Sequence, residues 1–212
     1  MSQSTPPATF TDRMRDLTAA PLNIVAARLH QWGVHPDVLT ILGLILVLIA
    51  SAFIAAGHLA VGGWLLIAGL PLDALDGAVA RVMQRKGRFG AVLDSTLDRF
   101  ADGFIFAALS YHFALDGRPD MILWAQAALI GSLGVSYVRA RADEVDVSVK
   151  VNIGFFTRFE RLAVIVAILI IPGLLLVPAL LEVGVIVLAV GTNITTIQRL
   201  YYVYRTLKQR GE

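Results

Sequence analysis

Four aspartates and one arginine stand at fixed spacing between Asp73 and Asp98, in a chain that is otherwise strongly apolar. The stretch reads D-x-x-D-G-x-x-A-R-x8-G-x-x-x-D-x-x-x-D. Ionisable side chains at membrane depth are costly and usually mark functional sites. Four carboxylates repel one another in a reduced dielectric, and one arginine cannot neutralise them. Because carboxylates without a neighbouring histidine or cysteine select hard cations, we expect a site for Mg²⁺, with Mn²⁺ as a substitute.

A divalent site of this kind favours chemistry on phosphates. Two ions about 3.5–4 Å apart stabilise displacement at phosphorus, and Mg²⁺ keeps coordination positions for substrate phosphates. Gly77, Ala80 and Gly90 would leave bare helix surface for a large ligand, and Arg81 would offer a charged fork to a phosphate. Glycine and alanine are also common where membrane helices pack together. The fixed spacing of these residues relative to the aspartates favours a ligand-binding role over a role in helix packing.

The elements that must hold these residues are membrane helices. The chain has 212 residues, of which 57% are hydrophobic and 16% charged, and its mean hydropathy is +0.71. The absence of cysteine excludes disulfides, thiolate metal sites and a cysteine nucleophile. A span takes about 20 apolar residues. Runs of that length predict an all-α integral membrane protein with six transmembrane helices, at roughly 38–57, 59–83, 93–115, 120–142, 159–178 and 180–205.

The N-terminal region differs from the six predicted spans. Residues 1–10 are polar and contain proline, which indicates a flexible tail without the apolar core of a secretory signal. Residues 10–32 mix apolar and charged side chains, which predicts an amphipathic juxtamembrane helix lying in the membrane interface. A soluble helix packed on the cytoplasmic face is the alternative. We expect residues 36–207 to form a single six-helix domain.

Basic residues define the orientation. With the N-terminus in the cytoplasm, Arg118 is alone on the outer side, whereas the other basic stretches fall inside: 13–28, 81–88, 139–161 and 199–210. The positive-inside rule therefore predicts a multi-pass protein of the cell (inner) membrane with both termini in the cytoplasm. The helices over 59–83 and 93–115 then run antiparallel. Their aspartate pairs, spaced i, i+3 and i, i+4, lie on facing surfaces near the cytoplasmic side, which predicts a cytoplasmic active site.

The stretch from Asp73 to Asp98 resembles the signature of the CDP-alcohol phosphotransferase family at every fixed position. The resemblance covers nearly the whole chain. It implies that the hydroxyl of an acceptor alcohol attacks the lipid-linked phosphoryl group of a CDP-activated donor, either CDP-diacylglycerol or CDP-archaeol, and releases CMP. It further implies that Asp73, Asp76 and Asp94 bind two Mg²⁺ ions, and that Asp98 contacts one ion and acts as general base. Family members are usually homodimers, and no nucleic acid is involved.

The resemblance also implies a donor site. Asp73, Gly77, Ala80, Arg81 and Gly90 are expected to bind the CDP moiety. Two residues near the start of the first predicted span are open to two interpretations. Asp37 and Thr40 either cap that helix or contact the nucleotide.

A second group of residues concerns the acceptor. Arginines at the cytoplasmic ends of the last three predicted helices would together form a phosphate pocket, although each alone fits positive-inside anchoring. These residues are Arg139, Arg158, Arg161 and Arg199. The segments around them, and the run Leu93 to Arg99, resemble the inositol-phosphate branch of the family. Thr157 and Phe159 depart from that branch, as does a longer loop over 143–156.

The predicted reaction is therefore Mg²⁺-dependent transfer of a phosphatidyl group to a phosphorylated polyol, with inositol phosphate as the expected acceptor. Asp102, four residues after Asp98, is a candidate ligand for an acceptor hydroxyl, or alternatively a partner of Arg99 or Arg139. Glycerol 3-phosphate is the alternative acceptor. A divalent-cation transporter is a more distant alternative, because it predicts carboxylates at the bilayer midplane and helix repeats that this sequence lacks.

Overall fold

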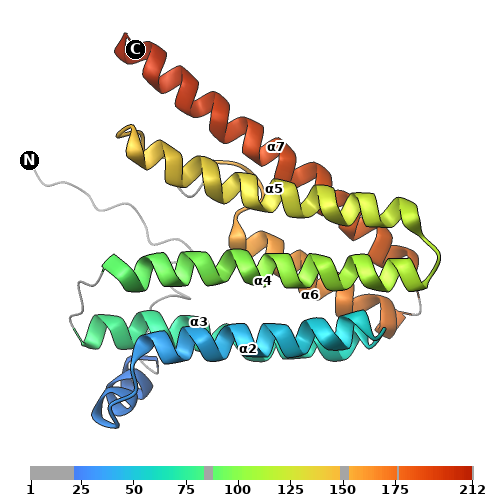
Figure 1. The fold of residues 1–212 in the computed structure, drawn as a ribbon, viewed down its shortest axis with the longest axis horizontal. Coiled ribbons are helices and arrows are strands. Elements are labelled where there is room, and N and C mark those ends of the chain that lie inside the picture. Colours follow the sequence, from blue (N-terminus) through green and yellow to red (C-terminus); the bar gives the residue numbers. More distant parts are fainter. Residues whose placement is uncertain (1–21, 84–87, 149–152, 176, 212) are drawn as a thin grey trace, which may run out of the picture. The chain divides into compact units, whose positions relative to one another are not determined.

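The computed structural model describes residues 22–83, 88–148, 153–175 and 177–211 (Figure 1). Within these ranges the structure is helical and contains no strand. A helix over 22–31 precedes six long helices. Their bounds are α2 (Pro36–Ala55), α3 (Leu59–Val82), α4 (Arg88–Leu115), α5 (Pro119–Glu144), α6 (Arg158–Leu175) and α7 (Ala179–Arg210). The predicted tail over 1–10 lies outside the described residues, as does the first part of the predicted amphipathic helix.

The six long helices match the six predicted runs, but several bounds differ. Helix α4 begins at Arg88 instead of 93, and α7 continues to Arg210 instead of ending at 205. The apolar run marks the part of a helix that suits hydrocarbon, whereas backbone hydrogen bonds continue through polar residues at its ends. The charged residues of α4 and α7 therefore lie within regular helix.

Among the residues that the structure describes, four helices are long and apolar enough to cross a membrane: α2, α3, α5 and α7. Helices α4 and α6 do not meet this criterion, because each carries three charged residues within its most apolar stretch. These residues are Asp98, Arg99 and Asp102 in α4, and Arg158, Glu160 and Arg161 in α6. Four of these six charged residues, Asp98, Asp102, Arg158 and Arg161, are candidate functional residues.

The chain divides into two compact units. The first unit comprises Met1–Gly43 and Gly69–Thr96, and the second comprises Leu44–Ala68 and Leu97–Glu212. In the first unit, Ala26 of the N-terminal helix is fully buried in an apolar cluster with Leu39, Ala78 and Val79. In the second unit, the main core includes Phe106, Leu169 and Leu188 among other apolar residues.

Helix α7 packs along α5 and also contacts α6 (Figure 1). Close approach to α5 requires glycine, because a Cβ atom at Gly131 would lie 2.1 Å from Thr192 Oγ1. Polar side chains of α7 then reach the backbone of α5. Asn193 Nδ2 donates to Ala127 O at 2.9 Å, and Thr196 Oγ1 donates to Gly131 O at 3.1 Å. These bonds fix the rotation of α7 about its axis, and therefore the direction of Arg199 one turn later.

Candidate active site

Three of the four signature aspartates meet in the first unit. Asp73 and Asp76 lie on one face of α3 near its end, and Asp94 lies in the second turn of α4. One carboxylate oxygen from each residue lies within 4.8 Å of the others. Asp73 is exposed, while Asp76 and Asp94 are half-buried. We call these three residues the acidic cluster.

Helix α2 contributes a hydroxyl to the acidic cluster. Thr40 Oγ1 lies 2.9 Å from Asp76 Oδ2 and is also 3.2 Å from Pro36 O. Because α2 begins at Pro36, Thr40 lies inside the helix and the interpretation of it as a cap is wrong. Asp37 lies in the first turn of α2, and its Oδ2 is 3.4 Å from His35 Nδ1.

The small residues of the signature also lie in the first unit. A Cβ atom added to Gly77 would be 3.5 Å from Arg81 Nη1, so the guanidinium of Arg81 lies over the bare surface that Gly77 leaves. A Cβ atom added to Gly90 would be 3.6 Å from Asp37 Oδ1, which places the Asp37 carboxylate beside the start of α4. Ala80 is half-buried. The residues expected to bind the donor thus gather around α3 and the facing ends of α2 and α4.

The donor atoms of the acidic cluster suit a hard divalent cation. All three ligands are carboxylates, and the chain contains no cysteine. Oxygens on opposite sides of a bound Mg²⁺ are about 4 Å apart, so oxygens within 4.8 Å need little movement to share an ion. The partial exposure of the cluster leaves room for coordinated water or substrate oxygen.

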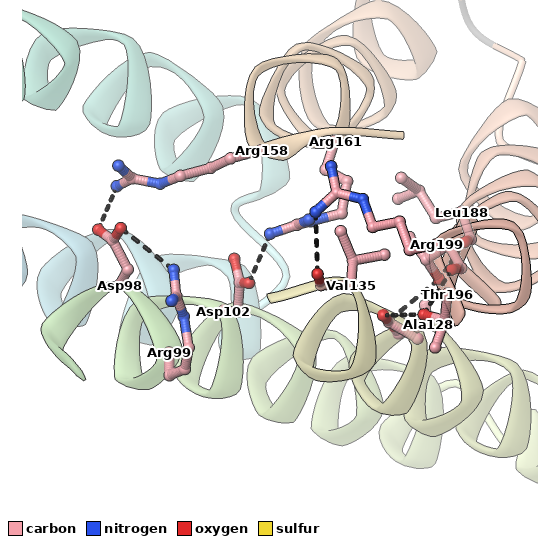
Figure 2. A network of polar contacts seen from close by, with 12 residues as sticks. Asp98, Arg99, Asp102, Ala128, Val135, Arg158, Arg161, Leu188, Thr196 and Arg199 are labelled. Atoms are coloured by element: carbon pink, nitrogen blue, oxygen red, sulfur yellow. Dashed lines mark hydrogen bonds and ion pairs between the residues drawn. The ribbon is translucent and has the colours of Figure 1, made fainter. Parts of the chain in front are cut away.

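Asp98 occurs one helical turn after Asp94 on α4 and belongs to the second unit, where two guanidinium groups contact it. Its Oδ1 is 2.5 Å from Arg158 Nη2, and its Oδ2 is 3.2 Å from Arg99 Nη2 (Figure 2). The side chain is 11% exposed. Arg158 was expected to bind an acceptor phosphate, and the structure places it against the candidate base. The sequence did not predict this contact.

Asp102 forms an ion pair with Arg161, at 3.0 Å between Oδ2 and Nη2 (Figure 2). Arg161 lies in the first turn of α6, so this pair joins α4 to α6. The Arg161 side chain is 2% exposed and that of Asp102 is 14% exposed. Sequence reasoning had offered Arg99 or Arg139 as partners for Asp102, and it missed Arg161.

Arg199 of α7 is buried, and backbone carbonyls hold its guanidinium. Its Nη1 donates to Val135 O at 2.9 Å, and its Nε donates to Ile153 O at 3.0 Å. The charges of Arg139 and Arg161 are close enough to repel that of Arg199. We call Arg139, Arg161 and Arg199 the arginine cluster. These three predicted residues come from α5, α6 and α7, and the charges of Arg139 and Arg161 act on that of Arg199.

The segment before α6 is attached to α7. Gly154 has a φ of +100°, a conformation that favours glycine, and a Cβ atom there would lie 2.2 Å from Thr195 Cγ2. The Phe156 backbone N–H donates to Thr195 Oγ1 at 3.1 Å. Together with the bond from Arg199 to Ile153 O, these contacts fix the chain just before α6 begins at Arg158.

The sequence of the chain matches a known family. The sequence model of the CDP-alcohol phosphatidyltransferases matches residues 33–197. The chain belongs to this family. Members of the family are transferases, so membership favours transferase activity over cation transport for this chain. It also identifies the chain as a multi-pass membrane enzyme.

Relatives within the family carry two related names. A phosphatidylinositol phosphate synthase of Cutibacterium acnes is 37% identical over 198 residues, covering 88% of this chain and 94% of the relative. An archaetidylinositol phosphate synthase of Methanothermobacter thermautotrophicus is 40% identical over 172 residues, covering 81% and 84%. The chain therefore aligns with relatives over most of their length.

Solved structures agree with the sequence comparison. The phosphatidylinositol phosphate synthase of Mycobacterium tuberculosis, in a crystal structure with CDP-DAG bound, matches with a TM-score of 0.79 and 34% identity, covering 86% of this chain and 93% of that one. The same synthase in complex with manganese and citrate also gives a TM-score of 0.79, covering 86% and 88%. A structural relative thus holds a divalent cation of the kind that suits the acidic cluster.

Proposed function

We propose that this chain transfers a phosphatidyl group from CDP-diacylglycerol, or its ether-lipid counterpart CDP-archaeol, to inositol phosphate, with release of CMP. The observation that carries the proposal is the acidic cluster, which gathers three signature carboxylates with oxygens within 4.8 Å. The names of the relatives support the reaction and the acceptor. Mg²⁺ is the expected cation, and Mn²⁺ is the expected substitute.

The first unit is proposed to bind the donor. Bound divalent cations would supply positive charge to the phosphates of the CDP group. Gly77 and Ala80 leave space on α3 for the nucleotide, and Arg81 offers a guanidinium beside that space. Gly90 and Asp37, which approach each other, complete the proposed donor site together with Thr40.

Asp98 is proposed as the general base and as a fourth metal ligand. The acceptor hydroxyl oxygen would form a bond to the phosphorus next to the lipid, while the bond from that phosphorus to the CMP oxygen breaks. The hydroxyl proton would pass to a carboxylate oxygen of Asp98. Arg99 and Arg158 hold this carboxylate in a defined orientation. Because a positioned base contributes only within hydrogen-bond reach, such orientation matters for the rate.

The arginine cluster is proposed to bind the phosphate of the acceptor. Three arginines from three helices interact electrostatically, and Asp102 is the carboxylate paired with one of them, Arg161. A phosphate dianion would offset the remaining positive charge and accept several charge-assisted hydrogen bonds. Arg158 is proposed as a fourth phosphate ligand, because its side chain is 42% exposed beside Asp98.

We further propose that all six long helices span the membrane, as one domain over residues 36–207 with both termini and the active site in the cytoplasm. The asymmetry of the basic residues supports this orientation. The N-terminal helix is proposed to lie in the interface, because Ile24 and Trp32 are 71% and 72% exposed although both are large and apolar. A homodimer is the proposed assembly.

A CMP-release assay tests the reaction. Purified protein in detergent or liposomes is given CDP-diacylglycerol or CDP-archaeol, Mg²⁺, and labelled inositol phosphate and glycerol 3-phosphate in competition. We expect CMP release with the label from inositol phosphate entering the lipid. Incorporation of glycerol phosphate instead would assign the alternative acceptor, and no CMP with any phosphorylated acceptor would refute the transferase.

The orientation has its own test. The chain contains no cysteine, so single cysteines can be introduced without a background of native thiols. A cysteine at Arg118 should react with an impermeant maleimide added outside intact cells, and one at Lys208 should react only after the membrane is opened. The reverse pattern would refute a cytoplasmic C-terminus.

A further inference from the structure

The ion pair between Asp102 and Arg161 is unusually deep for a pair that joins two helices. Arg161 is 2% exposed and Asp102 is 14% exposed, and the two groups lie 3.0 Å apart. Removing both charges from water costs about as much as their attraction returns, so such a pair is weak evidence of a role in stability. Its position beside a group of arginines suggests a different role.

Asp102 contacts one nitrogen of the Arg161 guanidinium and leaves another without a hydrogen-bond partner among the described residues. The bond to Asp102 uses Nη2, while Nε is buried and has no hydrogen-bond partner among the described residues. A buried donor without a partner is costly, and it is expected where a ligand supplies the acceptor. Since a guanidinium is planar and rigid, fixing Nη2 also fixes the direction in which Nε–H points.

The guanidinium of Arg199 is also held in a fixed orientation, but by backbone carbonyls. Its Nη1 and Nε are held by Val135 O and Ile153 O, which are fixed backbone groups of α5 and the following segment. Arg161 lacks such carbonyl contacts in the part of the chain that the structure describes, and the carboxylate of Asp102 takes their place. Both buried arginines are thus oriented before any ligand arrives.

We propose that Asp102 is a positioning residue that orients Arg161 toward the phosphate of the acceptor, and that it does not itself bind an acceptor hydroxyl. This inference rests on the proposed function. It predicts that Asp102 affects every ligand that carries the phosphate, whether or not the ligand has a polyol ring. It also predicts that Asp102 acts through Arg161 alone.

Inorganic phosphate separates the two roles, because it carries the anion without a hydroxyl-bearing ring. In Asp102→Asn, we expect the KM for inositol phosphate and the Ki for inorganic phosphate to rise together, by about 10- to 100-fold, the cost of disturbing hydrogen bonds to a charged group. The KM for CDP-diacylglycerol should stay near that of the native enzyme, and kcat should change far less than the KM for the acceptor.

A double-mutant cycle tests whether Asp102 acts through Arg161. The double variant Asp102→Asn with Arg161→Gln should match Arg161→Gln alone in the KM for inositol phosphate and the Ki for phosphate. Without the Arg161 guanidinium, the Asp102 carboxylate has no group to orient. The double variant also removes both buried charges together. It therefore keeps the comparison usable if Asp102→Asn alone does not fold.

Asp120→Asn provides a matched control. Asp120 is paired with Arg118 at 2.9 Å in the same unit, but it is 58% exposed. This variant loses the same chemical group from an ion pair and should leave the KM for inositol phosphate and the Ki for phosphate unchanged.

Several outcomes would overturn the proposal. A raised KM for inositol phosphate with an unchanged Ki for phosphate would make Asp102 a ligand of the acceptor hydroxyl. A lowered Tm with an unchanged acceptor KM would make the pair purely structural, and additive effects in the double variant would separate Asp102 from Arg161. If the native enzyme releases no CMP with any phosphorylated acceptor, the proposed function fails instead, independently of these variants.

Discussion

The acidic cluster and the arginine cluster are built in opposite ways. Asp73 is exposed and its two neighbours are half-buried, so the carboxylates of the acidic cluster remain accessible to water and ions. Arg161 and Arg199 are 2% and 3% exposed, and they are held by a carboxylate and by two backbone carbonyls. One cluster is suited to being completed by a cation, whereas the other is already ordered by the protein.

This difference predicts how each cluster responds to mutation. Changes in the acidic cluster should weaken metal binding and turnover while leaving the fold largely intact, because partly exposed groups contribute little to stability. Changes in the buried part of the arginine cluster should reduce stability as well as acceptor binding, because they leave buried polar atoms without partners.

The largest expected effect separates catalysis from binding. Asp98→Asn should reduce the rate of CMP release by about 10²- to 10⁴-fold, since the amide cannot accept the proton of the acceptor hydroxyl. Binding of CDP, followed by thermal shift, and the Tm without ligand should remain close to those of the native protein. Near-native turnover in this variant would show that Asp98 is not the base.

Arg199→Leu tests the buried part of the arginine cluster. It should lower the free energy of unfolding by about 2–4 kcal/mol, because the bonds that a charged donor makes to Val135 O and Ile153 O are both lost. The measurement is thermal or denaturant unfolding in detergent. Arg139→Leu is the matched control: Arg139 is exposed, so its loss should raise the KM for inositol phosphate with little change in stability. Equal destabilisation in both variants would contradict the distinction between them.

Asp76→Asn tests the acidic cluster, the more accessible of the two clusters. We expect the affinity for Mg²⁺ or Mn²⁺ to fall by about 10- to 100-fold, measured as the metal concentration that restores turnover after EDTA treatment. The Tm in EDTA should match that of the native protein. A large loss of Tm without metal would mean that the acidic cluster is structural.

Thr40→Val should give the smallest effect and sharpen the comparison within the first unit. It removes the hydroxyl that lies 2.9 Å from Asp76 Oδ2 without changing the size of the side chain. One hydrogen bond is worth about 0.5–1.5 kcal/mol, so metal affinity should fall by at most about tenfold. Titration of metal-dependent turnover measures it, and a loss as large as that of Asp76→Asn would show that Thr40 binds more than a neighbouring carboxylate.

Local spacing predicted the acidic cluster well, because two antiparallel helices joined by a short connection leave few arrangements for residues at fixed turns. The i, i+3 spacing of Asp73 and Asp76 determined their common face, and Asp94 followed from the start of the next helix. The six long helices were likewise readable from their apolar runs.

Contacts between distant segments were not predictable in the same way. Asp102 and Arg161 are 59 residues apart, and the rotation of α6 that joins them has no signature in either sequence segment. Thr40 was predicted either to cap a helix or to contact the nucleotide. Its contact with Asp76 was not predicted, because a sequence pattern does not show which carboxylate approaches from another helix 36 residues later. Arg199 was singled out from the sequence as a phosphate ligand, which stays a prediction, and the carbonyls that hold its guanidinium are backbone atoms that carry no sequence signal.

The attachment of the segment at Gly154 to α7 has a consequence for transplanting acceptor preference between relatives. The arginines at the start of α6 take their position from a segment whose backbone is bonded to Thr195 and Arg199. A chimera that exchanges α6 and its preceding loop alone would separate these arginines from their anchor. If the arginine cluster binds the acceptor as proposed, acceptor preference should be transferred only when the loop, α6 and α7 are exchanged together.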